Sequence, residues 1–232
     1  HGTWFQTAIG RPSFLKYEDS GGLIPVHNVG VSLDGAIPSG GLGLHYFAEI
    51  GNGRPYHDPA SGRNAVNNVV DSDGGKAVNF ALVARPMAIP GLQFGAGFYH
   101  DSLFPDGQRH TAEGIAHSHV VYKDAAWEFF AEAVGISHRP DGGRTLRSTA
   151  WFTQISRGFG VLRPYARYTF QKVPVKDGPF SLLGLTGEHS GPSVGLRWDL
   201  NDYAAYKIQL DRTSHSDTAT TNSVTLQVAL TF

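Results

Sequence analysis

The sequence predicts an all-β protein, folded as an antiparallel up-and-down transmembrane β-barrel of about 10–12 visible strands. Three observations support this fold class. Apolar residues recur at every second position along most of the chain, with hardly any sustained helical period. Most of these segments run about 10–13 residues, whereas strands of soluble proteins average about 5–6. The connections between them alternate between short and long, as in outer-membrane barrels.

The last stretch of the chain shows the alternation most clearly. Val224, Leu226, Val228, Leu230 and Phe232 are apolar, and the residues between them are polar or small. Successive side chains of a strand point to opposite faces, so one face here is apolar and the other polar. The same pattern over 194–200 and 204–211 predicts a meander of three strands at this end.

The remaining elements follow from the same periodicity, as one β-barrel domain over residues 1–232. Residues 3–9 add one further strand if they are extended. In chain order, the predicted strands are 25–34, 42–50, 76–86, 91–101, 110–122, 125–137, 145–157, 162–171, 194–200, 204–211 and 224–232.

Turn signals separate these strands. Glycines, a proline and a serine over 34–41 predict a connection, and this stretch lacks the Gly-x-x-x-x-Gly-Lys pattern of a nucleotide phosphate loop. Aromatic residues beside two tight turns, Tyr122 with Trp127 and Trp198 with Tyr203, predict a ring of aromatic side chains at one membrane interface; the alternative is that aromatics are simply common in strands. Tight turns are predicted at 89–91, 123–124, 157–158 and 201–202, and longer polar links at 51–75, 102–109, 138–144, 173–187 and 212–221.

Composition excludes several function classes. Cysteine is absent, which rules out a disulfide framework, thiolate metal sites and a cysteine nucleophile. Lys and Arg number 19 against 20 Asp and Glu, so nucleic acid is not expected as a partner. No apolar run reaches about 18 residues, which argues against a transmembrane helix. A mean hydropathy of -0.21 suits a barrel, because only alternate residues of its strands face lipid.

The N-terminal fifth of the chain resembles a group of bacterial outer-membrane proteins. The resemblance is carried by His1-Gly2-Thr3-Trp4-Phe5-Gln6-Thr7 with Arg11-Pro12, by Tyr17-Glu18 with Gly21-Gly22, and by Ile24-Pro25-Val26-His27-Asn28-Val29-Gly30. These stretches are similar to porin-like proteins related to the phosphate-selective porin O/P class. Such proteins carry further strands before the His-Gly-x-Trp segment, so the resemblance implies the C-terminal portion of a larger barrel or an unusually small one. The terminal Phe232 resembles the signal read by the outer-membrane assembly machinery.

The resemblance implies a non-enzymatic channel in the outer membrane of a Gram-negative cell, for passive diffusion of small polar or charged solutes. Its partners would be outer-membrane lipid, these solutes and further copies of the chain, and no cofactor or metal is expected. A closed structural or adhesive barrel is the alternative. If the apolar residues face lipid, the polar ones line the pore: His45, Glu49, Asn79, Arg85, Glu128, Glu132, Arg163, Arg167, Arg197, Lys207 and Asp211.

Eleven histidines raise two enzymatic alternatives. The run His117-Ser118-His119, with His100 and His110 nearby in sequence, suggests a metal site or a Ser-His hydrolase, although no acidic third member can be assigned. Histidines of a lumen or a loop without catalytic duty are the preferred interpretation. The start at His1-Gly2 also resembles copper-dependent polysaccharide monooxygenases, in which His1 would hold copper with His27, His45 or His117. The missing cysteines and the long strands argue against that enzyme.

Overall fold

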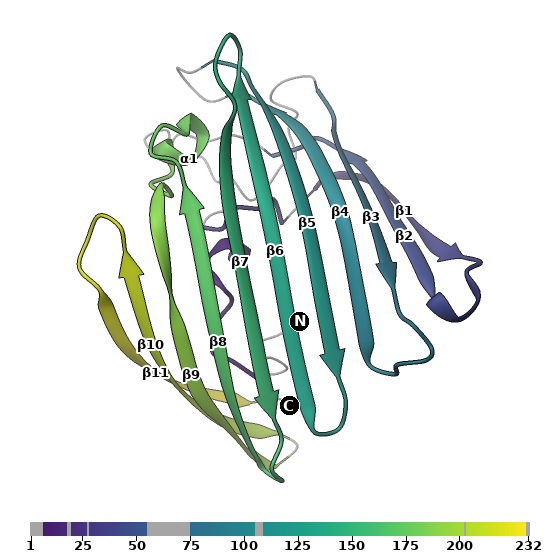
Figure 1. The fold of residues 1–232 in the computed structure, drawn as a ribbon, viewed down its shortest axis with the longest axis vertical. Coiled ribbons are helices and arrows are strands. Elements are labelled where there is room, and N and C mark those ends of the chain that lie inside the picture. The colour runs from purple at the N-terminus through teal and green to yellow at the C-terminus, as the bar shows by residue number, and fades with distance from the viewer. Residues whose placement is uncertain are drawn as a thin grey trace.

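The structure, a computed structural model, describes residues 7–17, 20–26, 28–54, 75–104, 109–201 and 203–230. In these residues eleven strands form one antiparallel sheet, in which each strand pairs with its neighbours in the sequence (Figure 1). The strands are β1 Gly30–Ile37, β2 Leu44–Gly51, β3 Ala77–Ala84, β4 Leu92–Leu103, β5 Thr111–Lys123, β6 Trp127–Pro140, β7 Leu146–Arg157, β8 Leu162–Val173, β9 Gly187–Asn201, β10 Ala204–His215 and β11 Thr221–Leu230. Short helices occur at η1 Ser13–Leu15, η3 Gly40–Leu42 and α1 Gly178–Leu182. The predicted all-β, up-and-down fold is therefore confirmed.

The strand pairing follows the sequence pattern from β4 onward, but two strands are considerably longer than predicted: β9 begins at Gly187 rather than at residue 194, and β10 continues to His215 rather than ending at residue 211. Tyr206 on β10 faces Trp198 on β9 and Val228 on β11, so apolar residues of three strands meet on one face. Because side chains alternate along each strand, a single register fixes the face of every residue in the sheet. The meander predicted for the C-terminal strands is present.

Three predictions near the N-terminus need correction. Strand β1 begins at Gly30, not at residue 25, since residues 20–26 instead lie against the sheet, where Leu23 is fully buried. The connection expected over 34–41 starts later, because Asp34 to Ile37 still pair with β2. Of the optional strand 3–9, residues 3–6 lie outside the described part, and residues 7–9 form no strand.

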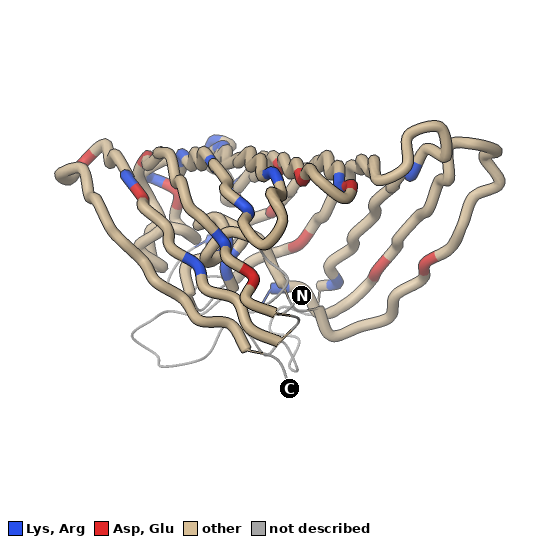
Figure 2. Tube along the Cα trace, turned by 90° about the horizontal axis from the view of Figure 1, so that it is seen from below, with Lys and Arg blue, Asp and Glu red and all other residues tan. Residues whose placement is uncertain are grey.

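The sheet is bent into a wide trough, with β1–β3 and β9–β11 forming its two sides (Figure 2). One rim carries the turns β1–β2, β3–β4, β5–β6, β7–β8 and β9–β10, and the opposite rim carries the other connections, including 174–186 with α1. These rims are called the turn rim and the loop rim below. Within the described residues, β1 and β11 do not pair with each other.

The two faces of the trough differ in kind. The concave face holds a buried core in which Phe14 and Leu23 of the N-terminal segment pack with sheet residues such as Ile115 and Phe152. The convex face carries large exposed apolar side chains, among them Phe80, Phe98, Ile155 and Leu226. No helix of the described residues is both long and apolar enough to cross a membrane.

Candidate functional site

Ten of the eleven polar residues singled out in the sequence share the concave face of the trough. Strand β6 shows the principle: Glu128 and Glu132 point inward together with buried Val134, Ile136 and His138, while Trp127 points outward. The pairing register extends this assignment to the other strands. The inward residues are His45 and Glu49 on β2, Asn79 on β3, Glu128 and Glu132 on β6, Arg163 and Arg167 on β8, Arg197 on β9, and Lys207 and Asp211 on β10; Arg85 follows directly after β3.

The structure joins some of these residues into pairs. Asn79 Nδ2 donates to Glu49 Oε2 at 2.6 Å, and Arg163 Nη1 lies 3.7 Å from Glu128 Oε1. The candidates of β2 and β3 are separated from those of β6 to β10 by strands β4 and β5. The two groups meet at one place, where Asn79 and Glu132 line the same small cavity.

Residues 7–26, called the inner segment below and described except for 18 and 19, cross the concave face. At the turn-rim end, the Thr7 hydroxyl donates to Glu128 Oε2 at 2.5 Å, and the Ile9 amide donates to Gln209 Oε1 at 2.9 Å. The guanidinium of Arg167 donates to the carbonyls of Ile9 and Gly10, each at 3.1 Å. The inner segment is therefore bound to β6, β8 and β10 through side chains far away in the sequence.

Further along, the inner segment contacts the sheet through both polar and apolar groups. Ser13 Oγ donates to Gln171 Oε1 at 3.0 Å and lies 3.1 Å from His189 Nε2. The rings of Phe14 and Phe152 have centroids 6.2 Å apart. This part of the concave face is packed like a protein core.

A cavity of about 830 Å³ remains between the inner segment and strands β5 to β8. Apolar side chains dominate its walls, and charged ones are placed singly among them. Its lining includes Leu15, Ile24, Pro25, Phe130 and Phe152 together with Arg11, Lys123, Glu128, Glu132 and Arg167. A smaller cavity of about 200 Å³ adjoins it and shares Leu15, Ile24, Pro25 and Glu132.

Two histidines near the cavities are packed over glycines of the neighbouring strand. A Cβ at Gly97 would lie 2.4 Å from His117 Nε2, and a Cβ at Gly95 would lie 2.6 Å from His119 Cε1. The imidazole rings therefore occupy space that exists only because β4 has glycine at both places. His119 Nε2 also lies 3.1 Å from Gln93 Nε2.

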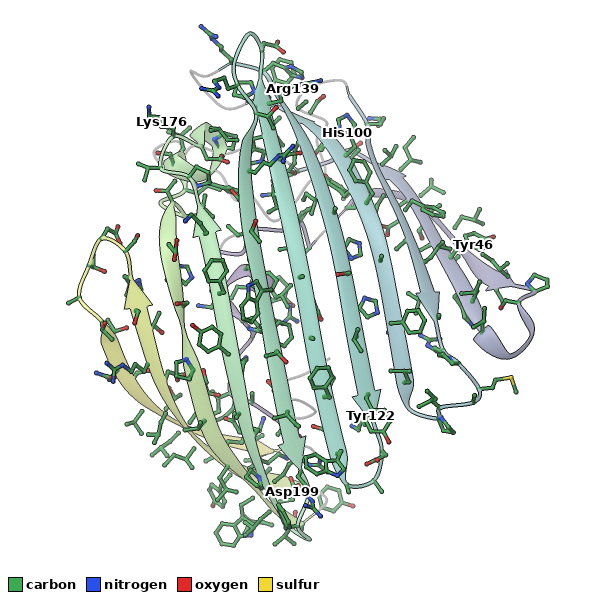
Figure 3. All side chains as sticks on the ribbon, viewed as in Figure 1. Tyr46, His100, Tyr122, Arg139, Lys176 and Asp199 are labelled. Atoms are coloured by element: carbon green, nitrogen blue, oxygen red, sulfur yellow. The ribbon has the colours of Figure 1, made fainter. Side chains whose placement is uncertain are left out.

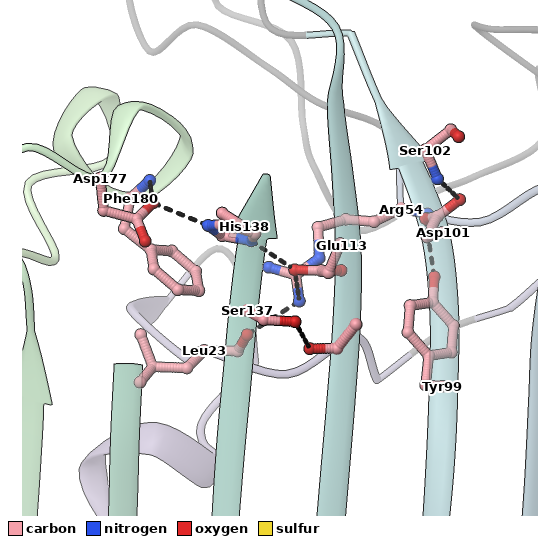
Figure 4. A network of polar contacts seen from close by, with 11 residues as sticks. Leu23, Arg54, Tyr99, Asp101, Ser102, Glu113, Ser137, His138, Asp177 and Phe180 are labelled. Carbon is pink, nitrogen blue, oxygen red and sulfur yellow. Dashed lines mark hydrogen bonds and ion pairs between the residues drawn. The ribbon is translucent and has the colours of Figure 1, made fainter. Parts of the chain in front are cut away.

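A buried polar network lies near the loop rim, where strands β4 to β6 meet the connection that carries α1 (Figure 4). His138 contacts two carboxylates: Nδ1 lies 2.7 Å from Asp177 Oδ1 and Nε2 lies 2.9 Å from Glu113 Oε2. Glu113 also lies 3.4 Å from the guanidinium of Arg54. Asp101 accepts from the Arg54 amide at 2.6 Å and from the Tyr99 hydroxyl at 2.7 Å. The network ties the ends of three strands to two loops.

The sequence pattern did not predict this network. Glu113 and His138 do stand at inward positions of an alternating pattern, which was the available signal. The residues that complete it, Arg54 and Asp177, lie in connections, where periodicity carries no information. Only the fold brings these distant residues together.

The enzymatic alternatives find no support in the geometry. Ser118 points to the convex face, opposite to His117 and His119, so the run does not form a Ser-His pair. His45 and His117 stand on β2 and β5, with two strands between them, and His1 and His27 lie outside the described residues. Among the residues described, no three His, Asp or Glu side chains form a group that could hold a metal ion.

An apolar convex face, a concave face with the polar candidates, and long neighbour-paired antiparallel strands define a porin-like fold. Solved porins share it. The anion-selective porin from Comamonas acidovorans superimposes with a TM-score of 0.58 at 12% identity, covering 86% of this chain and 54% of that chain. A second porin structure gives a TM-score of 0.56 at 11% identity, covering 87% of this chain and 60% of that one. The chain thus spans little more than half the length of these porins. No family model and no curated protein matches the sequence.

Proposed function

We propose that this chain forms the wall of a porin-like outer-membrane channel that passes small polar or charged solutes by passive diffusion. The main support for this proposal is that apolar and charged side chains lie on opposite faces of the sheet. On β8 the outward set, from Leu162 to Phe170, contains no charge, whereas the inward set includes Arg163 and Arg167. Soluble proteins bury their apolar faces, but transmembrane barrels present them to lipid.

The dimensions of the uncharged band support insertion in a membrane. The outward-facing uncharged stretch from Leu162 to Phe170 is nine residues long, and a tilted membrane-spanning strand needs about 9–11 residues. On the convex side of β4 to β10, Asp, Glu, Lys and Arg residues occur only near strand ends. They are Arg139, Arg147, Lys172, Glu188 and Arg212 toward the loop rim and Arg157 at the turn rim.

Aromatic side chains mark the turn rim, where an interface with lipid headgroups would lie. Trp127, Trp198 and Tyr203 are exposed beside the turns, and Figure 3 shows Tyr122 and Asp199 toward this end of the sheet. Arg157 lies over the rings of both Trp127 and Phe159, with its Cζ 4.9 Å from each centroid. Aromatic and basic side chains are typical anchors at headgroup level.

In this proposal the ten inward candidates line the solute path, Arg85 lies at its turn-rim end, and the inner segment narrows it. One of the similar structures is described as an anion-selective porin, whereas the inward set here mixes carboxylates such as Glu49 and Asp211 with Arg and Lys. Closure of the wall requires partners for the edges of β1 and β11, because a barrel leaves no strand edge unpaired. Further strands of a longer chain, or another copy, would supply them.

A closed structural barrel is the second candidate function. The observation that favours it is the packing of the inner segment: Phe14 and Leu23 are almost wholly buried against the concave face. In that case the segment blocks passage of solutes altogether.

Conductance in a planar bilayer separates the two candidates. The chain is folded in detergent and added to one side, and we expect stepwise, salt-dependent currents. A folded β protein that gives no current would favour the closed barrel. A chain that stays soluble and monomeric without detergent would overturn both membrane proposals.

Cysteine substitutions test the face assignment directly, because the natural chain has no cysteine. Asp211→Cys places a thiol on the concave face, and Leu210→Cys places one on the convex face of the same strand. In lipid, a charged membrane-impermeant thiosulfonate is expected to label Asp211→Cys and to change its current. Leu210→Cys is the matched control and is expected to stay unlabelled until detergent is added.

A further inference from the structure

The cavity beneath the inner segment has the size and the walls of a small-molecule site. Its volume of about 830 Å³ falls in the range of about 300–1,000 Å³ of pockets for drug-sized ligands. Apolar side chains line most of it, including Leu15, Ile24, Phe130 and Phe152. Ligand pockets combine such walls with a few polar groups that fix orientation.

Most charged groups at the cavity already have partners. Glu128 lies 3.2 Å from Lys123 Nζ and also accepts from Thr7 and Ser156. Arg167 donates to carbonyls of the inner segment. The guanidinium of Arg11 lies over the ring of Tyr17, with its Cζ 4.8 Å from the centroid.

Of the two carboxylates at the cavity, Glu132 is the one without such a partner. It lines both cavities at their junction, and its side chain has no hydrogen bond or ion pair with any described residue. Its cross-strand neighbours are His119 on β5 and Phe152 on β7, and Phe130 precedes it on the same face of β6. A half-buried carboxylate among apolar groups loses hydration without gaining a partner, which costs free energy. A cation placed there would relieve that cost.

The aromatic rings favour the same kind of ligand. The faces of Phe rings attract cations electrostatically, and they also pack against apolar groups. The carboxylate and its two phenyl neighbours therefore match a positively charged nitrogen attached to an apolar body. An organic anion would meet the unpaired carboxylate instead, while Lys123 already pairs with Glu128 and Arg167 already donates to carbonyls of the inner segment.

We propose that the cavity binds amphipathic organic cations, meaning protonated amines with an aryl or alkyl body, and that Glu132 holds the ammonium group. The site lies on the solute path, so its role in transport rests on the proposed channel function, whereas binding itself does not. The apolar body fills the space between Leu15, Ile24 and the rings of Phe130 and Phe152.

The test uses 2-phenylethylamine as the probe and the full chain folded in detergent. Binding is measured by isothermal titration calorimetry against 3-phenylpropionate, an anion of similar shape, and 2-phenylethanol, its neutral analogue. We expect the amine to bind at least about tenfold more tightly than either, as a charge-assisted contact implies. This comparison needs no variant, so it does not depend on a substitution being tolerated. Equal or tighter binding of the anion would overturn the proposal.

Glu132→Gln keeps the shape of the side chain and removes its charge. We expect this variant to bind the amine roughly tenfold or more weakly and to bind 2-phenylethanol as the natural chain does. Glu49→Gln is the matched control, since Glu49 is an inward carboxylate that lines neither cavity and is hydrogen-bonded to Asn79 in the wall of the smaller one; its affinity for the amine should be unchanged. Equal losses in both variants would contradict a role for Glu132.

Bilayer recordings keep the two proposals distinguishable. If the natural chain binds the amine in detergent but carries no current, the site exists and the channel proposal fails. If it carries current and the amine neither binds nor interrupts that current, the channel stands and the site is refuted.

Discussion

At the scale of single residues, the most constrained side chain is His138. Both ring nitrogens contact carboxylates, Asp177 at 2.7 Å and Glu113 at 2.9 Å, and only the imidazolium form donates from both nitrogens. The ring is fully buried and packs 4.7 Å from the centroid of Phe180. Its positive charge therefore balances two buried acids and fixes the α1 connection to the sheet.

Replacing His138 with leucine should destabilise the fold strongly. His138→Leu leaves buried Glu113 and Asp177 without their shared cation, and breaking a buried ion pair typically costs about 3 kcal/mol or more. Chemical denaturation in detergent, followed by tryptophan fluorescence, measures the change in the free energy of unfolding. His110→Leu is the control, because His110 pairs with the exposed Asp141; its expected cost is below about 1 kcal/mol. Equal costs would refute the account.

The turn between β5 and β6 depends on one carboxylate. Asp124 accepts hydrogen bonds from the amides of Trp127 at 2.6 Å and Ala126 at 2.8 Å and from the Tyr122 hydroxyl at 2.7 Å. The pKa of Asp124 lies below its ordinary value, chiefly because of the hydrogen bond from the Trp127 amide and also because of the other two donors. Because the pKa of Asp124 is lower in the folded chain than in the unfolded chain, the ionised carboxylate stabilises the turn at pH values above its ordinary pKa. This stabilisation is lost as the pH falls through the lowered pKa.

Carbon-13 NMR of the Asp124 side chain tests this. We expect a titration midpoint below 3.8, the ordinary value. Tyr122→Phe removes one of three donors, so its midpoint should rise but remain below that value. A natural chain that titrates at 3.8 or above would show that the turn does not hold the carboxylate as described.

At the scale of elements, the pairing of β4 with β5 depends on glycine. A Cβ at Gly97 would lie 2.4 Å from His117 Nε2 and 2.7 Å from the backbone carbonyl of Phe80. Gly97→Ala should therefore destabilise the sheet by about 1–3 kcal/mol, the usual cost of overpacking. On β6, a Cβ at Gly135 meets nothing within 4 Å, so Gly135→Ala should be neutral or stabilising by up to about 1 kcal/mol. Denaturation midpoints of the two variants give the comparison, and a harmless Gly97→Ala would contradict the close packing of His117.

The elements also show what a sequence can and cannot predict. Strands such as β8 and β10 bury one face over their whole length, so their local period determines both their existence and the side that each residue faces. The inner segment lacks this determinant. Its positions depend on partners such as Glu128 and Arg167, more than a hundred residues away. For the same reason the inward set was predictable from β2 onward, whereas the cavity and the network around His138 were not.

At the scale of the whole molecule, the inner segment decides whether the trough is a path or a closed wall. On β8 the inner segment is held by Arg167, which donates hydrogen bonds to the carbonyls of Ile9 and Gly10 and to the side chain of Gln209. Glutamine is shorter and uncharged, so Arg167→Gln loses the bonds to both carbonyls. We expect this variant to conduct more than the natural chain in a planar bilayer, because the segment leaves the concave face more often.

Arg85→Gln separates this effect from a change of charge. It removes one cation, but Arg85 is exposed beside the turn rim and donates to Gln93 without contacting the inner segment. If steric release governs the current, Arg167→Gln raises the conductance and Arg85→Gln alters at most the ion selectivity. If instead both variants shift ion selectivity alike and neither raises the conductance, the inner segment does not limit the current. Loss of the Arg167 hydrogen bonds would in that case have left the width of the path unchanged.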